Sequence, residues 1–339
     1  MKTRPLLIGL VAAAAALLIP DSVTVAEPTH VLNFGTVAPN GTPWADQLVG
    51  IKERVEKETN GAVQIKLFLA GTMGAEVEMT RDIRRGERLQ GGGMSTAAIA
   101  EGAGVPLLQL PELPYLFKSF EEADAVLDDV LMAPVTEQLA GKGFVFAGWA
   151  ENGWRSFATK GPVTSMEELR SYKMRSQESP VHIGMYKALG VPYATAPTTE
   201  VLGSLNTGIF DGFDNTPLFS LAAGLMEPVT HYTQSRHIYQ PAAVVYSKRY
   251  MDKMPADLQK VVLGDVRAES LNGRVGVRAL ETEMLEIMTS TGKTVTELDP
   301  ALRDEMAAAT KGVHSDFLAE NPDLKAYYDQ VTSKLSSMR

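Results

Sequence analysis

Hydrophobic positions follow two different repeats along this chain. In the segment 62–70, Val63, Ile65, Leu67 and Leu69 alternate with other residues, which is typical of a strand with one buried face. In the segment 43–58, apolar residues recur at intervals of three or four, as on one face of a helix. Further strands are predicted at 31–35, 91–100, 144–150, 156–158, 173–175, 191–196, 242–247 and 293–298, and helices at 76–90, 121–129, 135–139, 180–189 and 199–206. The alternation predicts an α/β fold with a largely parallel sheet.

A capped helix and a long helix interrupt this alternation. The run TSMEELR contains a capping box in either of two registers, Thr164 with Glu167 or Ser165 with Glu168. Residues 255–289 hold no proline after Pro255 and keep a helical apolar pattern, which predicts one helix of about 50 Å that crosses more than one lobe. The alternative is two helices broken near Asn272-Gly273.

The N-terminus has the layout of a secretory signal peptide. Lys2 and Arg4 precede an apolar run from Leu6 to Ile19, and small residues precede Glu27. This run is short for a membrane span, so we expect residues 1–26 to be cleaved during export. An N-terminal anchor helix is the alternative.

Composition narrows the location and the partners. The chain has no cysteine, which excludes disulfides, a thiolate nucleophile and a lipidated cysteine. Its 41 acidic and 32 basic residues give a net charge of −9, which argues against nucleic acid and an anionic membrane surface as partners. A local basic site can still bind an anionic small molecule. We therefore predict a protein free in a bacterial periplasm.

Motifs of common enzymes and cofactor sites are missing from the sequence. The five histidines are dispersed, and there is no HExxH, GxSxG, Walker A or GxGxxG motif. The glycine run 91–93 indicates close backbone packing or approach to a ligand. Acidic neighbours such as Glu76 and Glu78 fit a solvated helix face. An enzyme is unsupported, although carboxylates from separate loops would leave no local motif.

Two arginines in extended segments are candidates for ligand binding. Arg155 lies near Trp154 and Phe157, and Arg175 follows Met174, so both guanidinium groups are expected to be partly buried. A buried guanidinium needs a partner, either a carboxylate of the protein or one belonging to a ligand.

The two arginine segments, together with other motifs along the chain, resemble the extracytoplasmic solute-binding proteins of TRAP (tripartite ATP-independent periplasmic) transporters. The resemblance covers almost the whole chain after the leader, in order. It rests on GTMGAE (71–76), LPELPYLF (110–117), WAENGWRSF (149–157), VTSMEELRSYKMRSQESP (163–180), YKALGVPYATAPTTEV (186–201), GIFDGFDNTP (208–217) and the segment 236–262. It implies a two-lobed α/β clam, with 27–151 and about 241–268 in lobe I, 152–240 and about 269–339 in lobe II, and the long helix 255–289 across both.

The resemblance also implies roles for individual residues. Arg175 occupies the place of the arginine that forms a bidentate salt bridge with the ligand carboxylate, and Asn215 that of the asparagine holding the same carboxylate. Arg155 matches a second arginine in or beside the site. The alternative for Arg175 is an internal salt bridge. The alternatives for Arg155 are to orient a neighbouring group or to bridge the lobes. Glu76 and Ser95 complete the polar part of the predicted site.

Three departures from the family pattern predict a less polar pocket. Met94 and Ser95 stand where polar contacts are common, Thr42 replaces a histidine before Pro43, and Phe213 stands in a usually polar place. Trp154, Phe213 and Tyr239 are expected to line the pocket, with plain core packing as the competing interpretation for each.

The predicted function is capture of a small organic acid of modest polarity and its delivery to the membrane subunits of a sodium-coupled transporter. The chain meets the membrane only through that partner, and no cofactor is expected. A sensory module of the same fold and a secreted enzyme acting on a carboxylate are the alternatives. Ligand identity, a metal ion bound with the ligand, and dimerisation stay open.

Overall fold

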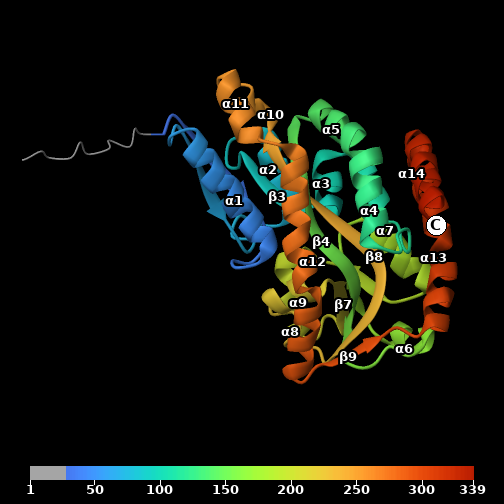
Figure 1. Ribbon diagram of the computed structural model, residues 1–339. Coiled ribbons are helices and arrows are strands. Elements are labelled where there is room, and N and C mark those ends of the chain that lie inside the picture. The colour runs from blue at the N-terminus through green and yellow to red at the C-terminus, as the bar shows by residue number, and fades with distance from the viewer. Residues whose placement is uncertain (1–27) are drawn as a thin grey trace, which may run out of the picture.

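The computed structural model describes residues 28–339, and the predicted signal peptide lies outside these residues (Figure 1). Nine strands form one sheet in the order β2-β1-β3-β8-β4-β7-β5-β6, and β9 pairs with β8. The strands are β1 (His30–Gly35), β2 (Val63–Phe68), β3 (Gly91–Ser95), β4 (Phe144–Thr159), β5 (Met174–Ser176), β6 (Tyr193–Thr195), β7 (Gly212–Asn215), β8 (His231–Ser247) and β9 (Thr294–Glu297).

Helices connect the strands and cover the sheet. The α-helices are α1 (Pro43–Glu58), α2 (Glu76–Arg85), α3 (Thr96–Ala103), α4 (Phe120–Val126), α5 (Met132–Gly141), α6 (Met166–Ser171), α7 (Pro180–Leu189), α8 (Val201–Asn206), α9 (Pro217–Ala222), α10 (Lys248–Met251), α11 (Ala256–Leu263), α12 (Val266–Ser290), α13 (Pro300–Glu320) and α14 (Lys325–Met338). A π-helical turn, η2 (Leu127–Leu131), follows α4, and short 3₁₀ turns are η1 (Pro106–Glu112), η3 (Thr198–Glu200) and η4 (Pro322–Leu324).

The sheet is mixed, which corrects the prediction of a largely parallel one. Strands pair in parallel at both ends, in β2-β1-β3 and in β7-β5-β6. The centre is antiparallel, because β4 and β8, of 16 and 17 residues, run against each other along their length. These two strands pass through both halves of the molecule, and three register shifts interrupt their pairing.

The glycine run of β3 is needed for close strand packing. A side chain on Gly92 would clash with the carbonyl oxygen of Gly35 in β1, and one on Gly91 would clash with the ring of Phe34. The predicted strand 91–100 ends at Ser95, because the Ser95 hydroxyl accepts a hydrogen bond from the Ala98 amide and begins α3. The glycines therefore serve backbone packing.

The predicted single helix 255–289 is two helices. Helix α11 ends at Leu263, and Gly264 has φ 64°, which the right-handed helix does not allow. Asp265 then caps α12 by accepting hydrogen bonds from the amides of Arg267 and Ala268. The break thus lies at 264–265 rather than near Asn272-Gly273. Helix α12 packs along β4 and also contacts α1, α9 and β9.

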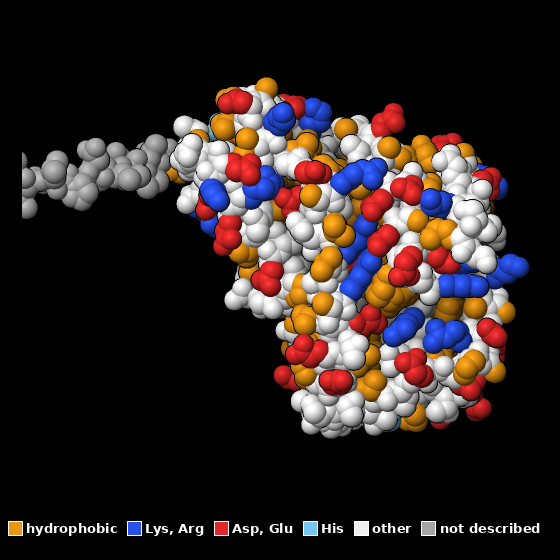
Figure 2. Space-filling model, in the orientation of Figure 1, with side chains coloured by type: hydrophobic (Ala, Val, Ile, Leu, Met, Phe, Trp, Pro, Cys, Tyr) orange, Lys and Arg blue, Asp and Glu red, His pale blue; other side chains and the backbone are white. Residues whose placement is uncertain are grey.

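Ion pairs fasten α12 to the elements beside it. Arg274 makes two hydrogen bonds of 2.7 Å to Asp128. One turn later Arg278 binds Asp124 at 2.6 and 2.7 Å and reaches the buried Glu151 of β4 at 2.8 Å. Figure 2 shows this ladder as alternating basic and acidic side chains beside α12. The long helix is therefore anchored by charge as well as by apolar packing.

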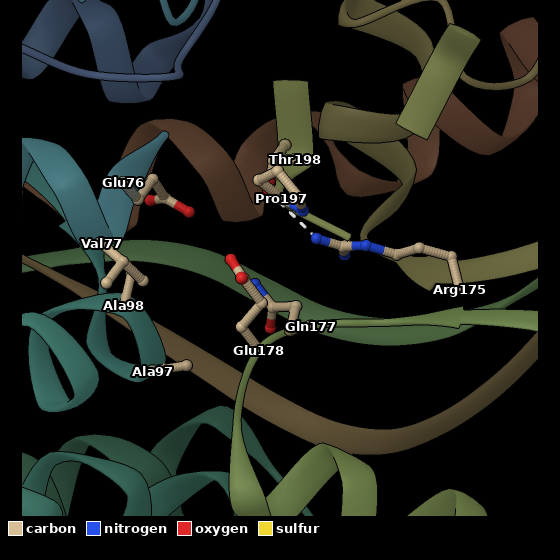
Figure 3. Close-up of a pocket in the computed structure, with 9 residues that line it drawn as sticks. All are labelled: Glu76, Val77, Ala97, Ala98, Arg175, Gln177, Glu178, Pro197 and Thr198. Atoms are coloured by element: carbon tan, nitrogen blue, oxygen red, sulfur yellow. Dashed lines mark hydrogen bonds between the residues drawn. The ribbon is translucent and has the colours of Figure 1, made fainter. Parts of the chain in front are cut away.

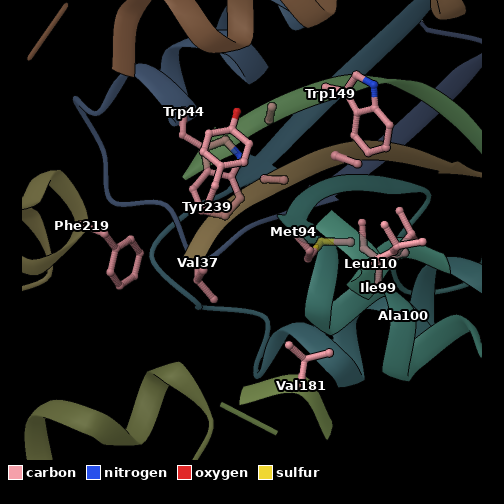
Figure 4. Packing of buried hydrophobic residues seen from close by; sticks show 14 of the residues in the cluster. Val37, Trp44, Met94, Ile99, Ala100, Leu110, Trp149, Val181, Phe219 and Tyr239 are labelled. Carbon is pink, nitrogen blue, oxygen red and sulfur yellow. The ribbon is translucent and has the colours of Figure 1, made fainter. Parts of the chain in front are cut away.

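Most of the hydrophobic core is one cluster that continues across the sheet (Figure 4). Trp44, Met94 and Trp149 belong to it and are almost fully buried. Met79 and Met174 are also completely buried and act as core filling.

Candidate ligand-binding site

Arg175, in the middle of β5, is a buried cation that forms no ion pair with a carboxylate of the described residues. Its Nε and Nη2 donate hydrogen bonds of 2.9 and 2.6 Å to the carbonyl oxygen of Ala196, and Nη2 reaches Thr198 Oγ1 at 3.4 Å. Among residues 28–339 it forms no ion pair, and its Nη1 has no hydrogen-bond partner. Burial, together with the positive charge of Arg155, lowers the pKa of Arg175 to about 10. The internal salt bridge considered as an alternative is not present in this part of the chain.

The guanidinium lies against a small cavity between segments far apart in the sequence (Figure 3). Its volume is about 20 Å³, and Glu76 lies across it from Arg175. The other residues around it are Val77, Ala97, Ala98, Gln177, Glu178, Pro197 and Thr198. A neighbouring cavity of about 10 Å³ shares Glu76, Gln177 and Thr198 with it. About 10–15 Å³ of such space holds one water molecule, so the two cavities have room for water but are too small for an organic acid.

Glu76, the first residue of α2, is a buried carboxylate facing the cavity. It accepts hydrogen bonds from the Ser95 amide at 2.8 Å and from the Ser95 hydroxyl at 3.2 Å. Burial raises the pKa of Glu76, although these hydrogen bonds and the charge of Arg175 oppose the rise. Ser95 therefore holds Glu76 in place and also lines the neighbouring cavity.

Asn215 ends β7 with its amide nitrogen available. Its Oδ1 accepts hydrogen bonds from the Thr216 amide at 2.8 Å, from Asn152 at 3.2 Å and from Arg155 at 3.4 Å. Its Nδ2 donates to no residue of the described chain, and the side chain lines the cavity next to that of Arg175. The carbonyl side is fixed by the protein, so the NH₂ group is the part that can bind a ligand.

Arg155 is fully buried and has a carboxylate partner within the protein. Its Nε donates to Asp214 Oδ2 at 2.6 Å, Nη2 donates to the Asp214 carbonyl, and Nη1 donates to Gln240 at 2.7 Å. Burial favours the neutral acid, but the Arg155 guanidinium and a hydrogen bond from His237 outweigh it and hold the pKa of Asp214 well below its usual range. This geometry corresponds to the orienting role weighed for Arg155.

A buried polar network missed by the sequence reasoning surrounds these groups. Gln240 donates to Glu112 at 2.7 Å and to Gln177 at 2.6 Å, and accepts from Asn152 at 2.7 Å. Glu112 is in turn bonded to His182 at 2.8 Å. Asn152 lies inside the ENGWR motif and could have been found from it, whereas Gln240 meets it only through the pairing of β4 with β8.

The three aromatic residues expected to line the pocket line neither cavity. Trp154 and Tyr239 pack edge to face, with ring centroids 5.3 Å apart, and Phe213 lies in the hydrophobic core. Along β4 and β8 the adjacent residues Arg155 and Gln240 face the polar network instead. Successive side chains of a strand point to opposite faces, so Trp154 and Tyr239 belong to the other side of the sheet. Phe213 and Tyr239 therefore pack in the core, whereas Trp154 lines a different cavity on its side of the sheet.

The cavity walls are more polar than the sequence led us to expect. Met94 and Phe213, two of the residues behind that expectation, are buried in the core, and Thr42 accepts a hydrogen bond at the start of α1. In the neighbouring cavity of about 10 Å³, the apolar wall residues are Val37, Trp44 and Phe219. Its other walls are Glu76, Ser95, Asn152, Arg155, Gln177, Thr198, Asn215 and Gln240.

Residues 28–339 provide neither a cluster of metal-binding side chains nor a membrane-spanning helix. They contain no group of three or more histidine or acidic side chains placed to hold a metal ion. None of their helices has the length and apolar character of a membrane span.

Comparison with known proteins gives a consistent set of similarities. The sequence model of a family described as bacterial extracellular solute-binding protein, family 7, matches residues 34–321. The C4-dicarboxylate-binding periplasmic protein DctP of Rhodobacter capsulatus is 30% identical over 313 residues, covering 91% of each chain.

Solved structures of TRAP periplasmic solute-binding proteins are similar over nearly their whole length. The protein from Citrobacter koseri, with bound D-glucuronate, is 28% identical with a TM-score of 0.82, covering 89% of this chain and 98% of that one. The protein from Xanthobacter autotrophicus, with bound β-D-galacturonate, is 25% identical with a TM-score of 0.82, covering 89% and 99%. The α/β architecture described above is thus the two-lobed clam of these structures.

Proposed function

Because this chain belongs to family 7 of the bacterial extracellular solute-binding proteins, we propose that it captures a small organic acid between two lobes and delivers it to a TRAP-type membrane transporter. It carries out no chemical step on that acid. The relatives named as periplasmic and the layout of residues 1–26 support export to the periplasm. The membrane subunits of the transporter are its protein partner.

The observation that carries this proposal is the pairing of Arg175. A buried guanidinium bonded only to neutral oxygens is energetically unfavourable unless an anion completes its surroundings. Its planar guanidinium suits a carboxylate. Arg175 lines the cavity, and its Nη1 has no hydrogen-bond partner among residues 28–339, so this group can bind a ligand there. The NH₂ group of Asn215 supplies a second donor to the same acid.

We propose a hydroxylated monocarboxylate, such as a sugar acid, as the ligand class. A dicarboxylate requires a second cation, but Arg155 is already neutralised by Asp214. Glu76 repels a second negative charge while its oxygens can accept hydrogen bonds from hydroxyl groups. Gln177 and Asn152 add further polar atoms to the walls. The acids bound by the Citrobacter and Xanthobacter proteins belong to this class.

The cavities at Arg175 and Asn215 are smaller than an organic acid, so ligand binding requires a movement that enlarges them. We assign residues 27–151 and about 241–268 to lobe I, and 152–240 and about 269–339 to lobe II. Glu76 and Ser95 then belong to the first lobe, and Arg175 and Asn215 to the second. Separation of the lobes exposes both halves of the site, and a bound acid favours the closed form because it contacts both.

Thermal unfolding with a panel of acids tests the proposal. The panel contains D-glucuronate, D-galacturonate, succinate and malate, applied to the wild-type chain, to Arg175→Met and to Arg170→Met. Arg170 is a matched control because its Nε also donates to a backbone carbonyl, that of Leu189, away from the cavities. A ligand at about a hundredfold its dissociation constant adds about 2.7 kcal/mol, which raises the Tm by about 5 °C in a chain of this size.

We expect a sugar acid to stabilise the wild-type chain and Arg170→Met, and to leave Arg175→Met unchanged. Equal shifts in all three proteins would show that Arg175 does not bind the carboxylate. A larger shift with succinate or malate would overturn the assignment to hydroxylated monocarboxylates. Mass spectrometry of the acid released on denaturation checks that it is recovered unchanged, as expected for a binding protein.

A further inference from the structure

A larger cavity lies on the opposite side of β4 from Arg155. Its volume is about 620 Å³, within the range of about 300–1,000 Å³ usual for small-molecule sites. Figure 2 shows a hollow between α12 and α13 in which hydrophobic and basic side chains gather. Its walls are Tyr115, the segment 117–121, Trp154, Arg236 and the α13 residues Arg303, Asp304 and Ala307.

Aromatic rings form one wall of this cavity. Phe120 lies 5.9 Å from Trp154 between ring centroids, and Tyr239 packs behind both at 6.2 and 5.3 Å. Trp154 is 7% exposed, and its indole N–H donates to no residue among 28–339. A preformed flat surface with an open donor at its edge suits a ring-bearing ligand with an acceptor group.

Arg303 resembles Arg175 in that its guanidinium group donates hydrogen bonds to backbone carbonyl oxygens. Its Nη1 and Nη2 donate to the carbonyl oxygens of Ser235 and Gln234 at 2.9 and 3.2 Å. It forms no ion pair with any described carboxylate. The guanidinium is thus fixed in position by neutral acceptors, while its charge has no partner in this part of the protein.

The charges around the cavity favour an anion with a single charge. Lys118, Arg236 and Arg303 supply three positive charges, and Glu121 and Asp304 two negative ones. Arg236 also forms an ion pair with Glu281, at 3.5 Å. With Glu281 included the charges cancel, so one carboxylate can pair locally with Arg303, whereas a second negative charge meets repulsion from Glu121 and Asp304.

Backbone strain is concentrated at the same place. Tyr115 and Arg236 have φ values of 54° and 44°, in the left-handed region that ordinary side chains rarely adopt. Only Asn60 and Ala70 share this property among the non-glycine residues that the structure describes. Strained residues persist where the surrounding structure holds them, and they cluster at binding sites.

We propose that this cavity is a second ligand site, which binds a small monocarboxylate carrying an aromatic ring. The ring lies against Phe120 and Trp154, and the carboxylate pairs with Arg303. The sheet separates this site from the cavity of Arg175, so both sites can be occupied in the same molecule. The inference is independent of the ligand proposed for the first site.

Calorimetric titration with phenylacetate and indole-3-acetate tests this site, with the neutral phenylacetamide and the dianionic isophthalate as comparison probes. We expect one saturable site for the monocarboxylates, with equal affinity in the wild-type chain and in Arg175→Met. Arg303→Met should weaken binding roughly 10- to 100-fold, as loss of a charged hydrogen-bond donor does. Phenylacetamide should bind weakly or not at all.

Two further variants locate the probe and guard against misfolding. Trp154→Phe should weaken the binding of phenylacetate, because the indole N–H and part of the ring surface are lost, and should lose most of the change in tryptophan fluorescence that phenylacetate causes. If Arg303→Met has the Tm of the wild-type chain, its loss of binding is not caused by unfolding. Lys118→Met removes a second cation at the rim of the cavity and should lower the affinity for the monocarboxylates by a smaller factor. The proposal is overturned if no ring-bearing monocarboxylate binds the wild-type chain at millimolar concentration, or if Arg175→Met abolishes binding and Arg303→Met does not. Neither result bears on whether sugar acids stabilise the protein through Arg175.

Discussion

Replacing Asp214 by asparagine should destabilise the protein strongly, although the two side chains have nearly the same shape. Asp214 is fully buried and accepts hydrogen bonds from Arg155 at 2.6 Å and from Tyr186 at 2.8 Å. His237 lies 3.4 Å from the same carboxylate. The substitution removes the negative charge and turns one acceptor atom into a donor that faces other donors.

The size of the effect follows from the burial of the pair. Removing one partner of a buried ion pair leaves an uncompensated charge, which costs about 3–5 kcal/mol. Here the remaining charge is that of Arg155, and the nearby Arg175 adds repulsion. For a chain of this length, about 2 °C per kcal/mol gives a fall in Tm of roughly 6–10 °C.

Asp211, three residues earlier in the same motif, offers a matched control. It forms an ion pair with Lys160 at 3.1 Å, and about two fifths of each side chain is exposed. Surface pairs of this kind contribute at most about 1 kcal/mol. Denaturant unfolding of the wild-type chain, Asp211→Asn and Asp214→Asn at pH 7 should therefore separate the two variants by at least about 2 kcal/mol.

Acid should remove the difference between the wild-type chain and Asp214→Asn. The pKa of Asp214 is depressed on folding, so its contribution is complete above its usual value of 3.8 and is lost as the pH falls through the lower folded value. The reasoning is refuted if Asp214→Asn is as stable as Asp211→Asn at pH 7, or if their difference grows below pH 3.8.

Three more outcomes follow from the packing and the charges. Arg278→Met leaves the carboxylate of Glu151 buried without its cation, and urea unfolding should show a loss of about 3 kcal/mol; a loss below 1 kcal/mol would contradict this. Gly92→Ala should unfold at a much lower temperature, because its side chain meets the β1 backbone, whereas Gly50→Ala, in an exposed position of α1 with open space around it, should gain about 0.5–1 kcal/mol; equal effects in calorimetry would refute the contact argument. The raised pKa of Glu76 means that the folded chain retains a proton more readily than the unfolded chain, so stability falls as the pH rises above 4.5. Glu76→Gln should lack that fall and be the more stable protein at pH 7, and the opposite order in thermal scans would show that its bonds to Ser95 dominate.

Helices and helix caps with a short-range sequence pattern were predicted from that pattern. The predicted helix 180–189 is α7, and of the two capping registers the structure uses Ser165, whose hydroxyl accepts a hydrogen bond from the Glu168 amide at 3.1 Å. The segments 144–150 and 156–158, predicted as separate strands, are one strand. Gly153, with φ 108°, lets β4 continue through a bulge that no periodicity shows.

The same bulges explain which parts of the site could not be predicted. The polar candidates Arg175, Asn215 and Glu76 do line adjoining cavities, because charge and motif identify them without knowledge of orientation. For Trp154 and Tyr239 the sheet face decides the role, and each register shift between β4 and β8 resets the count of alternating residues. The partners Gln177 and Gln240 meet across 63 positions of the chain, a distance over which no local pattern acts.

The alternation along β4 and β8 limits how this protein can evolve. Arg155 and Gln240 serve the polar network on one side, while their neighbours Trp154 and Tyr239 serve the aromatic packing on the other. Inserting or deleting a single residue in either strand would exchange these neighbours, and so damage both sides of the sheet at once. Within these strands, change should therefore proceed by substitution, one face at a time. Length variation should accumulate instead in connections such as the segment 197–200, which reaches the cavity without belonging to the sheet.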